Sequence, residues 1–137
     1  MNCNAYISGT GYHVPNRIVS NDELSNYMDT SDDWIVDRTG IKERRYIDSN
    51  IGPSDLSIKA VEMALKNANL TVLDIDLIIF ATSTPDYYAP GSGCLLQHKM
   101  GFKNIGALDI RVQCSGFIYG LSIAEQYIRT GTYENIL

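Results

Sequence analysis

Basic residues, histidine and cysteine are all scarce in this sequence, and the lack of each excludes a class of protein or of site. Its 137 residues include 11 Lys and Arg against 16 Asp and Glu, which gives a net charge of −5. That balance argues against a general nucleic-acid-binding protein, which needs an excess of basic side chains. The three cysteines, Cys3, Cys94 and Cys114, are too few and too widely spaced for a disulfide framework or a zinc site. We therefore expect no bound metal and a reducing compartment.

A long apolar run is also lacking. The most apolar segment, Leu77–Ala81, has the length of a strand, whereas crossing a bilayer takes about 20 apolar residues. The first residues show no basic stretch followed by an apolar one, so the sequence predicts no secretory signal. With 45% hydrophobic and 20% charged residues, the composition is that of a soluble globular domain. We expect a cytoplasmic protein with no membrane partner.

The first fifty residues carry signals for short elements. Ala5–Ile7 is predicted as a short strand, and Gly9-Thr10-Gly11 as a turn leading to Pro15. A dinucleotide-binding loop is the less favoured interpretation of these glycines, because the third glycine and the following helix are missing. Two short helices are predicted from capping patterns, followed by a short extended segment; their ranges are 21–27, 31–39 and 43–47.

Helical and apolar extended segments alternate from about residue 53. We predict helices at 53–69, 94–100 and 114–130, and strands at 74–82, 106–111 and from 134. This order favours an α/β layered fold with a largely parallel sheet. On the last helix, one apolar face consists of Phe117, Leu121, Ala124 and Ile128. Because the sequence ends within the first residues of an apolar strand, we expect a truncated chain.

Cys114 follows a predicted strand and directly precedes a predicted helix. Such a turn exposes the sulfur at the carboxyl edge of a parallel sheet, where α/β enzymes place their sites. It also directs backbone N–H groups and the positive end of a helix dipole toward the sulfur. A helix end alone activates a thiol only modestly, and neither His13 nor His98 is well placed to act as its base. On these residues alone a buried structural cysteine stays the favoured interpretation, with a nucleophile as the alternative.

A known family accounts for several segments together. Residues 29–44 read DTSDDWIVDRTGIKER, which closely resembles the block DTSDEWIxxRTGIxER of β-ketoacyl-acyl carrier protein synthase III, a condensing enzyme of the thiolase superfamily. Three further segments occur in the family's order and spacing: Ile7–Gly11 with Pro15, Ala81–Pro85, and Cys114–Phe117. The resemblance spans essentially the whole chain. It implies an N-terminal domain at residues 1–137, the first half of a thiolase-like αβαβα fold with a mostly parallel sheet.

The resemblance also implies a reaction. An acyl group passes from coenzyme A to Cys114, and malonyl-acyl carrier protein then loses CO₂ and attacks the thioester, which initiates fatty acid synthesis. A histidine and an asparagine from a second half complete the family's catalytic triad. The implied partners are acyl-coenzyme A, malonyl-acyl carrier protein and a second copy of the chain in a homodimer, and no separate cofactor is implied. We therefore expect that residues 1–137 alone do not turn over.

Binding residues follow from the same resemblance. Trp34 and Arg38 match positions that line the coenzyme A tunnel, and a spacing of four places both on one helix face. The alternative is a purely structural role, with Trp34 partly buried on its helix and Arg38 packed beside it. Thr30 is a weaker contact candidate that a helix cap explains equally well. Ala89 matches a position that closes the acyl pocket of the neighbouring subunit, where many relatives carry a bulky residue.

One departure from the family pattern lies beside the cysteine. Arg111-Val112-Gln113 precedes Cys114 where many members carry small residues, so Arg111 either places charge near the entrance or marks a divergent subgroup. Two alternatives to the condensing enzyme follow. One is a related synthase or acyltransferase of secondary metabolism with a different primer, and the other is a non-catalytic half-molecule that acts as an interaction subunit. A cysteine hydrolase is a distant third, because the histidines are poorly placed.

Overall fold

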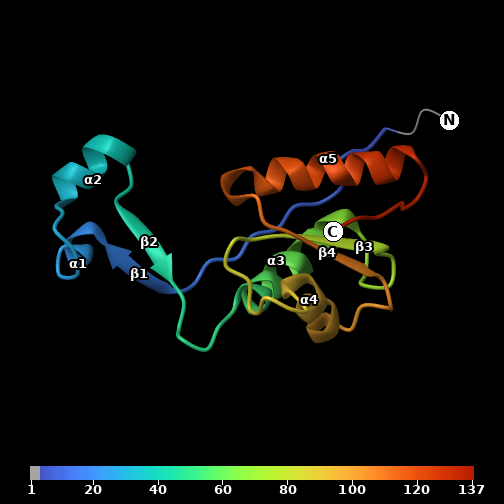
Figure 1. Cartoon of the computed structure of the whole chain (residues 1–137), viewed down its shortest axis with the longest axis horizontal. Helices are drawn as coiled ribbons and strands as arrows, with labels where there is room; N and C mark the ends of the chain where they lie inside the picture. Colours follow the sequence, from blue (N-terminus) through green and yellow to red (C-terminus); the bar gives the residue numbers. More distant parts are fainter. Residues whose placement is uncertain (1–3) are drawn as a thin grey trace. The chain divides into compact units, whose positions relative to one another are not determined.

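A computed structural model describes residues 4–137, and Cys3 therefore lies outside the described residues. The chain divides into two compact units (Figure 1). The smaller unit is Val14–Ile51, and the larger unit combines the residues up to His13 with Gly52–Leu137. Of the helices described, none has both the length and the apolar character needed to cross a membrane.

The smaller unit is a two-stranded antiparallel sheet with two short helices. Its elements are β1 (Arg17–Ser20), α1 (Asn21–Leu24), α2 (Asp32–Thr39) and β2 (Glu43–Tyr46). Val19 on β1 is fully buried and pairs with Arg44 on β2. The buried Asn21 side chain donates to Asp32 Oδ1 at 2.7 Å and accepts from Arg44 Nη2 at 2.5 Å. Asn21 therefore joins α1 to both α2 and β2.

The helix limits in this unit follow the capping residues. Ser20 Oγ accepts from the Glu23 N–H at 3.1 Å, and Ser31 Oγ accepts from the Trp34 N–H at 3.2 Å. Each hydroxyl satisfies an amide that has no partner within the first turn of its helix. Gly40, with φ of 71°, ends α2 in the left-handed conformation that favours glycine. The predictions of both helices and of the extended segment at 43–47 are confirmed, although α1 ends earlier than predicted, at Leu24.

The larger unit contains a parallel pair of strands. Its elements are α3 (Pro53–Ala68), β3 (Leu77–Ala81), α4 (Ser92–Met100), β4 (Gly106–Ile110), the 3₁₀ turn η1 (Gln113–Ser115) and α5 (Gly116–Arg129). In the β3–β4 pair Ile79 lies opposite Leu108. On the other edge of β3, Ile136 pairs with Leu77 in parallel, and the Leu137 N–H donates to the Leu77 carbonyl at 3.0 Å. The predicted start of a strand near the end of the chain is therefore confirmed.

Helices lie on both faces of this sheet (Figure 1). On one face Val61 and Leu65 of α3, Ile78 of β3 and Leu96 of α4 form the buried core. On the other face α5 packs over β3, in agreement with the alternation of side chains along a strand. The larger unit thus forms an α–β–α arrangement, as the alternation of helices and strands predicts.

The N-terminal segment differs from its prediction. No strand is assigned at Ala5–Ile7, because no neighbouring segment of the described chain pairs with it. The glycines that follow serve close packing against α3 instead of a turn. A Cβ atom on Gly9 would lie 2.3 Å from the Ala64 carbonyl oxygen, and one on Gly11 would lie 2.0 Å from that of Ala60. The Gly9-Thr10-Gly11 pattern therefore reflects contact with a helix, and not a nucleotide-binding loop.

The apolar face predicted on α5 is only partly covered, since Ala124 and Ile128 are half-buried. Phe117 and Leu121, which the periodicity groups on one apolar face, are 69% and 38% exposed. The side of α5 that meets β3 carries Gly116 and Gly120. Periodicity identifies an apolar stripe, but a glycine-lined contact carries no hydrophobic signal.

Candidate active site around Cys114

Cys114 lies in η1, the turn that connects β4 to α5, and is exposed. The prediction of a strand, a turn and a helix around it is confirmed, although α5 itself begins at Gly116. The residue before the cysteine, Gln113, has φ of 48°, a left-handed conformation that non-glycine residues seldom adopt. Such backbone strain persists only where surrounding contacts enforce it, and it occurs often at functional turns.

Close packing of α5 on β3 fixes the position of this turn. Gly116 is buried, and a Cβ atom there would lie only 3.0 Å from Ala81 Cβ. One helical turn later, a Cβ atom on Gly120 would lie 3.6 Å from Ile79 Cγ2. The Thr82 N–H donates to the Ile110 carbonyl at 3.2 Å and joins the ends of the two strands. Cys114 is therefore held at the carboxyl edge of the parallel pair, as predicted.

Asp109 on β4 joins this strand to the start of α4. Its carboxylate accepts from the Ser92 N–H at 2.7 Å and from the Gly93 N–H at 2.9 Å, which satisfies two amides of the first helical turn. Gly91, with φ of 99°, precedes them, and a Cβ atom there would lie 2.6 Å from Asp109 Oδ2. Glycine at position 91 therefore meets both a backbone requirement and a steric one.

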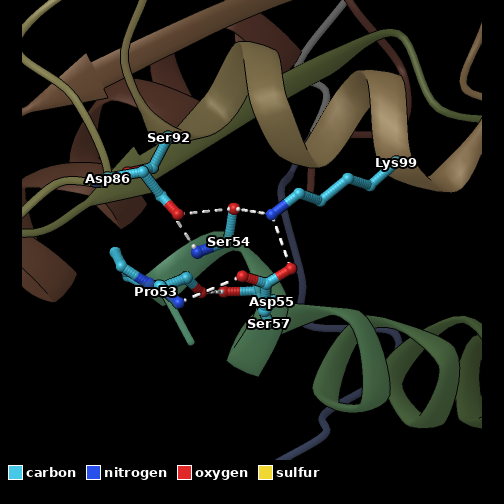
Figure 2. Close-up of polar contacts among 8 residues, drawn as sticks. Pro53, Ser54, Asp55, Ser57, Asp86, Ser92 and Lys99 are labelled. Carbon is cyan, nitrogen blue, oxygen red and sulfur yellow. Dashed lines mark hydrogen bonds and ion pairs between the residues drawn. The ribbon is translucent and has the colours of Figure 1, made fainter. Parts of the chain in front are cut away.

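A polar network anchors the segment between β3 and α4 on α3 (Figure 2). The fully buried Ser54 donates from its hydroxyl to Asp86 Oδ1 at 2.8 Å and from its N–H to Asp86 Oδ2 at 3.2 Å. The Asp86 N–H donates to Ser92 Oγ at 3.1 Å. Burial alone would raise the pKa of Asp86, but hydrogen bonds from Ser92 and Ser54 outweigh it and hold this pKa below its usual value.

Lys99 completes the network from α4. Its ammonium group donates to Ser54 Oγ at 2.7 Å and to Asp55 Oδ1 at 2.5 Å (Figure 2). The hydrogen bond from Lys99 and a second one from the Gly52 N–H lower the pKa of Asp55. One lysine thereby links α4 to the first turn of α3. Local sequence patterns do not reveal this network, because its members lie up to 45 residues apart.

The predicted coenzyme A residues occur in the smaller unit. The Arg38 guanidinium carbon lies 4.3 Å from the centre of the Trp34 ring, so the predicted pairing on one face of α2 is present. The indole is 53% exposed and can still offer apolar surface to a ligand. Thr30 Oγ1 is buried and forms no hydrogen bond within residues 4–137. A buried hydroxyl without a partner is unusual in a folded protein.

The predicted acyl-pocket residue, Ala89, is exposed in the segment between Asp86 and Gly91. Beside it Arg111 Nη2 donates to the Tyr88 carbonyl at 3.1 Å, and the guanidinium carbon lies 4.9 Å from the centre of the Tyr88 ring. Arg111, which departs from the family pattern, therefore contacts the segment that carries Ala89.

The two histidines take no visible part in the site. His98 is exposed on α4, His13 is half-buried, and within the described residues neither forms a hydrogen bond with Cys114. No group of three or more His, Cys, Asp or Glu side chains in residues 4–137 is arranged to hold a metal ion.

A cysteine exposed where a parallel strand meets a helix, with helices on both faces of the sheet, agrees with the thiolase-like α/β fold that the resemblance implies. The comparisons with known proteins identify the relatives. The profile of the family 3-Oxoacyl-[acyl-carrier-protein (ACP)] synthase III matches residues 108–137, which include Cys114. The crystal structure of 3-oxoacyl-[acyl-carrier-protein] synthase III from Aquifex aeolicus is similar, with a TM-score of 0.90 and 42% identity, over 95% of this chain and 42% of that one.

Curated sequences agree with this comparison. Beta-ketoacyl-[acyl-carrier-protein] synthase III of Caldanaerobacter subterraneus is 50% identical over 133 residues, which are 97% of this chain and 40% of the relative. The protein of that name from Clostridium acetobutylicum is 48% identical over 131 residues, 96% of this chain and again 40% of the relative. The chain is a homologue of β-ketoacyl-acyl carrier protein synthase III, and the predicted resemblance is confirmed. It spans about 40% of the length of these curated relatives.

Proposed function

We propose that the full-length protein carrying this chain is a condensing enzyme that transfers an acyl group from coenzyme A to Cys114. The observation that carries the proposal is the exposed Cys114 at the junction of β4 and α5. The chain that carries it is 50% identical in sequence, over 133 residues, to a relative named beta-ketoacyl-[acyl-carrier-protein] synthase III. In the first step the Cys114 thiolate attacks the thioester carbonyl, and the coenzyme A thiolate leaves and takes up a proton. An acyl-cysteine is the product.

The second step uses malonyl-acyl carrier protein. Loss of CO₂ from the malonyl group leaves a carbanion, which attacks the acyl-cysteine carbonyl, forms the new carbon–carbon bond and releases the Cys114 thiolate. Backbone N–H groups at the start of α5 are suited to hold the oxyanion that forms in each step. We propose that a histidine and an asparagine outside this chain stabilise the carbanion, and that the enzyme is a cytoplasmic homodimer with the layered αβαβα fold.

Binding of coenzyme A is proposed at α2. The exposed Trp34 ring offers an aromatic surface to adenine, and Arg38 beside it offers a cation to the phosphates. Thr30 is proposed as a further contact because it directly precedes Ser31, the N-cap residue of α2. Ala89 is proposed to line the acyl pocket of the partner subunit, where its small side chain leaves room for a longer or branched acyl chain.

The test is covalent labelling of the full-length protein. The protein is incubated with a panel of acyl-coenzyme A thioesters, its intact mass is measured, and any adduct is located by peptide digestion. We expect an acyl adduct on Cys114 that is absent from Cys114→Ala and present in Cys94→Ser, because Cys94 lies on α4 away from the strand-to-helix turn. Labelling that is lost in Cys94→Ser, or no labelling of the unsubstituted protein, would contradict the proposal and favour the non-catalytic alternative.

A further inference from the structure

The four residues Tyr87–Pro90, here called the Tyr87–Pro90 segment, are exposed and anchored at both ends. Before the segment, Asp86 is bonded to Ser54 and Ser92. After it, the amide of Ser92 is bonded to Asp109. Each anchor joins the segment to a packed element, so its ends have fixed positions while its middle extends into solvent.

Arg111 contacts the middle of the segment. In the described part of the chain, the one hydrogen bond to Tyr87–Pro90 runs from Arg111 Nη2 to the Tyr88 carbonyl, at 3.1 Å. The guanidinium also lies against the Tyr88 ring, 4.9 Å from its centre, although this ring is 90% exposed. Arg111 belongs to no ion pair in residues 4–137, so its planar contacts with Tyr88 are what orient it.

Arg111 also belongs to the end of the strand that delivers Cys114. It follows β4 directly and precedes the cysteine by three residues. Arg111 therefore contacts the Tyr87–Pro90 segment from a position next to the backbone that carries Cys114. The next residue after Tyr88 is Ala89, the position assigned above to the acyl pocket.

We propose that Arg111 is a positioning residue that sets acyl-chain selectivity by holding the Tyr87–Pro90 segment in place. The inference rests on the proposed function, since only there does Ala89 meet the acyl chain. With the contact present, the pocket wall at Ala89 has a defined position and discriminates between acyl chains of different length and branching. Without it, the segment loses the hydrogen bond and the ring contact that Arg111 supplies, and the wall adapts to chains that it normally rejects.

The test compares variants of the full-length protein. For each of them, kcat/KM for acylation of Cys114 is measured with straight and branched acyl-coenzyme A thioesters of increasing length. In Arg111→Ala the ratio between the preferred and the poorest substrate is expected to fall by about two- to fivefold, the factor that an exposed cation–π contact is worth. Tyr88→Ala removes the ring contact but keeps the backbone carbonyl, so its loss should not exceed that of Arg111→Ala, and the double variant should lose no more than Arg111→Ala.

Two conservative variants separate positioning from charge and from general damage. Tyr88→Phe keeps the ring and the backbone carbonyl, so its selectivity should equal that of the unsubstituted protein. Arg111→Lys keeps the charge but not the planar group, so it should lose part of the selectivity, up to the loss in Arg111→Ala. If Arg111→Lys retains full selectivity, charge and not positioning is responsible and the inference is wrong.

The remaining outcomes are distinct. An equal decline with all thioesters in Arg111→Ala would show a merely structural role and overturn the inference. Normal acylation of Cys114 with unchanged selectivity in Arg111→Ala would overturn the inference and leave the proposed function intact. Absence of Cys114 acylation in the unsubstituted protein would overturn the proposed function, and the inference with it.

Discussion

Removal of the Ser54 hydroxyl is the sharpest test of the network between α3 and α4. Ser54 is fully buried, and its hydroxyl donates to the Asp86 carboxylate and accepts from the Lys99 ammonium group (Figure 2). In Ser54→Ala both charged groups lose a partner, and the methyl group that remains offers no replacement. A hydrogen bond to a charged group contributes roughly 1.5–3 kcal/mol to stability.

The expected loss is smaller than the sum of two such bonds. Asp86 keeps the Ser54 N–H as a donor, and Lys99 keeps Asp55 and is partly exposed to water. We therefore expect Ser54→Ala to lower the free energy of unfolding by about 2 kcal/mol. The loss of a donor should also raise the pKa of Asp86, so acid unfolding should begin at a higher pH in the variant.

Ser57 provides a matched control on the same helix. Its hydroxyl donates to the Pro53 carbonyl one turn earlier, at 2.8 Å, and within residues 4–137 it forms no hydrogen bond with a charged group (Figure 2). Ser57→Ala should be neutral or stabilising by a few tenths of a kcal/mol, because alanine has the higher helix propensity. Both variants are measured by urea unfolding of the full-length protein. If Ser54→Ala lies within about 0.5 kcal/mol of Ser57→Ala, the energetic role assigned to the network is wrong.

Two further predictions concern the same larger unit. Asp86→Asn should destabilise the protein at neutral pH, because the lowered pKa of Asp86 provides stability above its unfolded value of 3.8. This stability is lost on protonation, so the difference in unfolding free energy from the unsubstituted protein should shrink as the pH falls below 3.8. A constant difference across unfolding curves from neutral to acid pH would contradict this. Gly116→Ala places a methyl group 3.0 Å from Ala81 Cβ, so it should lower the stability by about 1 kcal/mol and slow Cys114 acylation. Gly120→Ala has its nearest contacts at 3.6 Å and beyond, so it should stabilise α5 by up to about 1 kcal/mol. Thermal unfolding of the pair decides the point, and equal shifts of both variants would show that the approach of α5 to β3 is not tight.

Local signals in the sequence were sufficient for the limits of α2 and for the strand, turn and helix around the cysteine. Ser31 and Gly40 cap α2 with atoms of the same turn, so the information lies within a few neighbouring residues. The turn at Cys114 likewise depends on a strand ending and a helix beginning in adjacent segments. The pairing of Trp34 with Arg38 needed only the helical repeat.

Contacts between distant segments could not be predicted in the same way. Lys99 meets Ser54 from 45 residues away, and either residue alone resembles an ordinary polar surface position. The exposed Phe117 shows a related difficulty, because an apolar stripe on α5 does not reveal which side of the helix faces the sheet. Gly116 and Gly120 do face the sheet, but hydrophobic periodicity does not identify them, because they allow a close approach of backbones by having no side chain.

The position of Asp109 also affects how the chain can fold. The first amides of α4 receive their partner from a residue 16 and 17 positions later in the sequence, which α4 reaches only after β4 has formed beside β3. An isolated helix of nine residues is marginal in water, and this one has no side-chain cap of its own. During synthesis, the Ser92 and Gly93 amides therefore lack this partner until Asp109 has been added to the chain. One carboxylate thus links the start of α4 to the docking of β4.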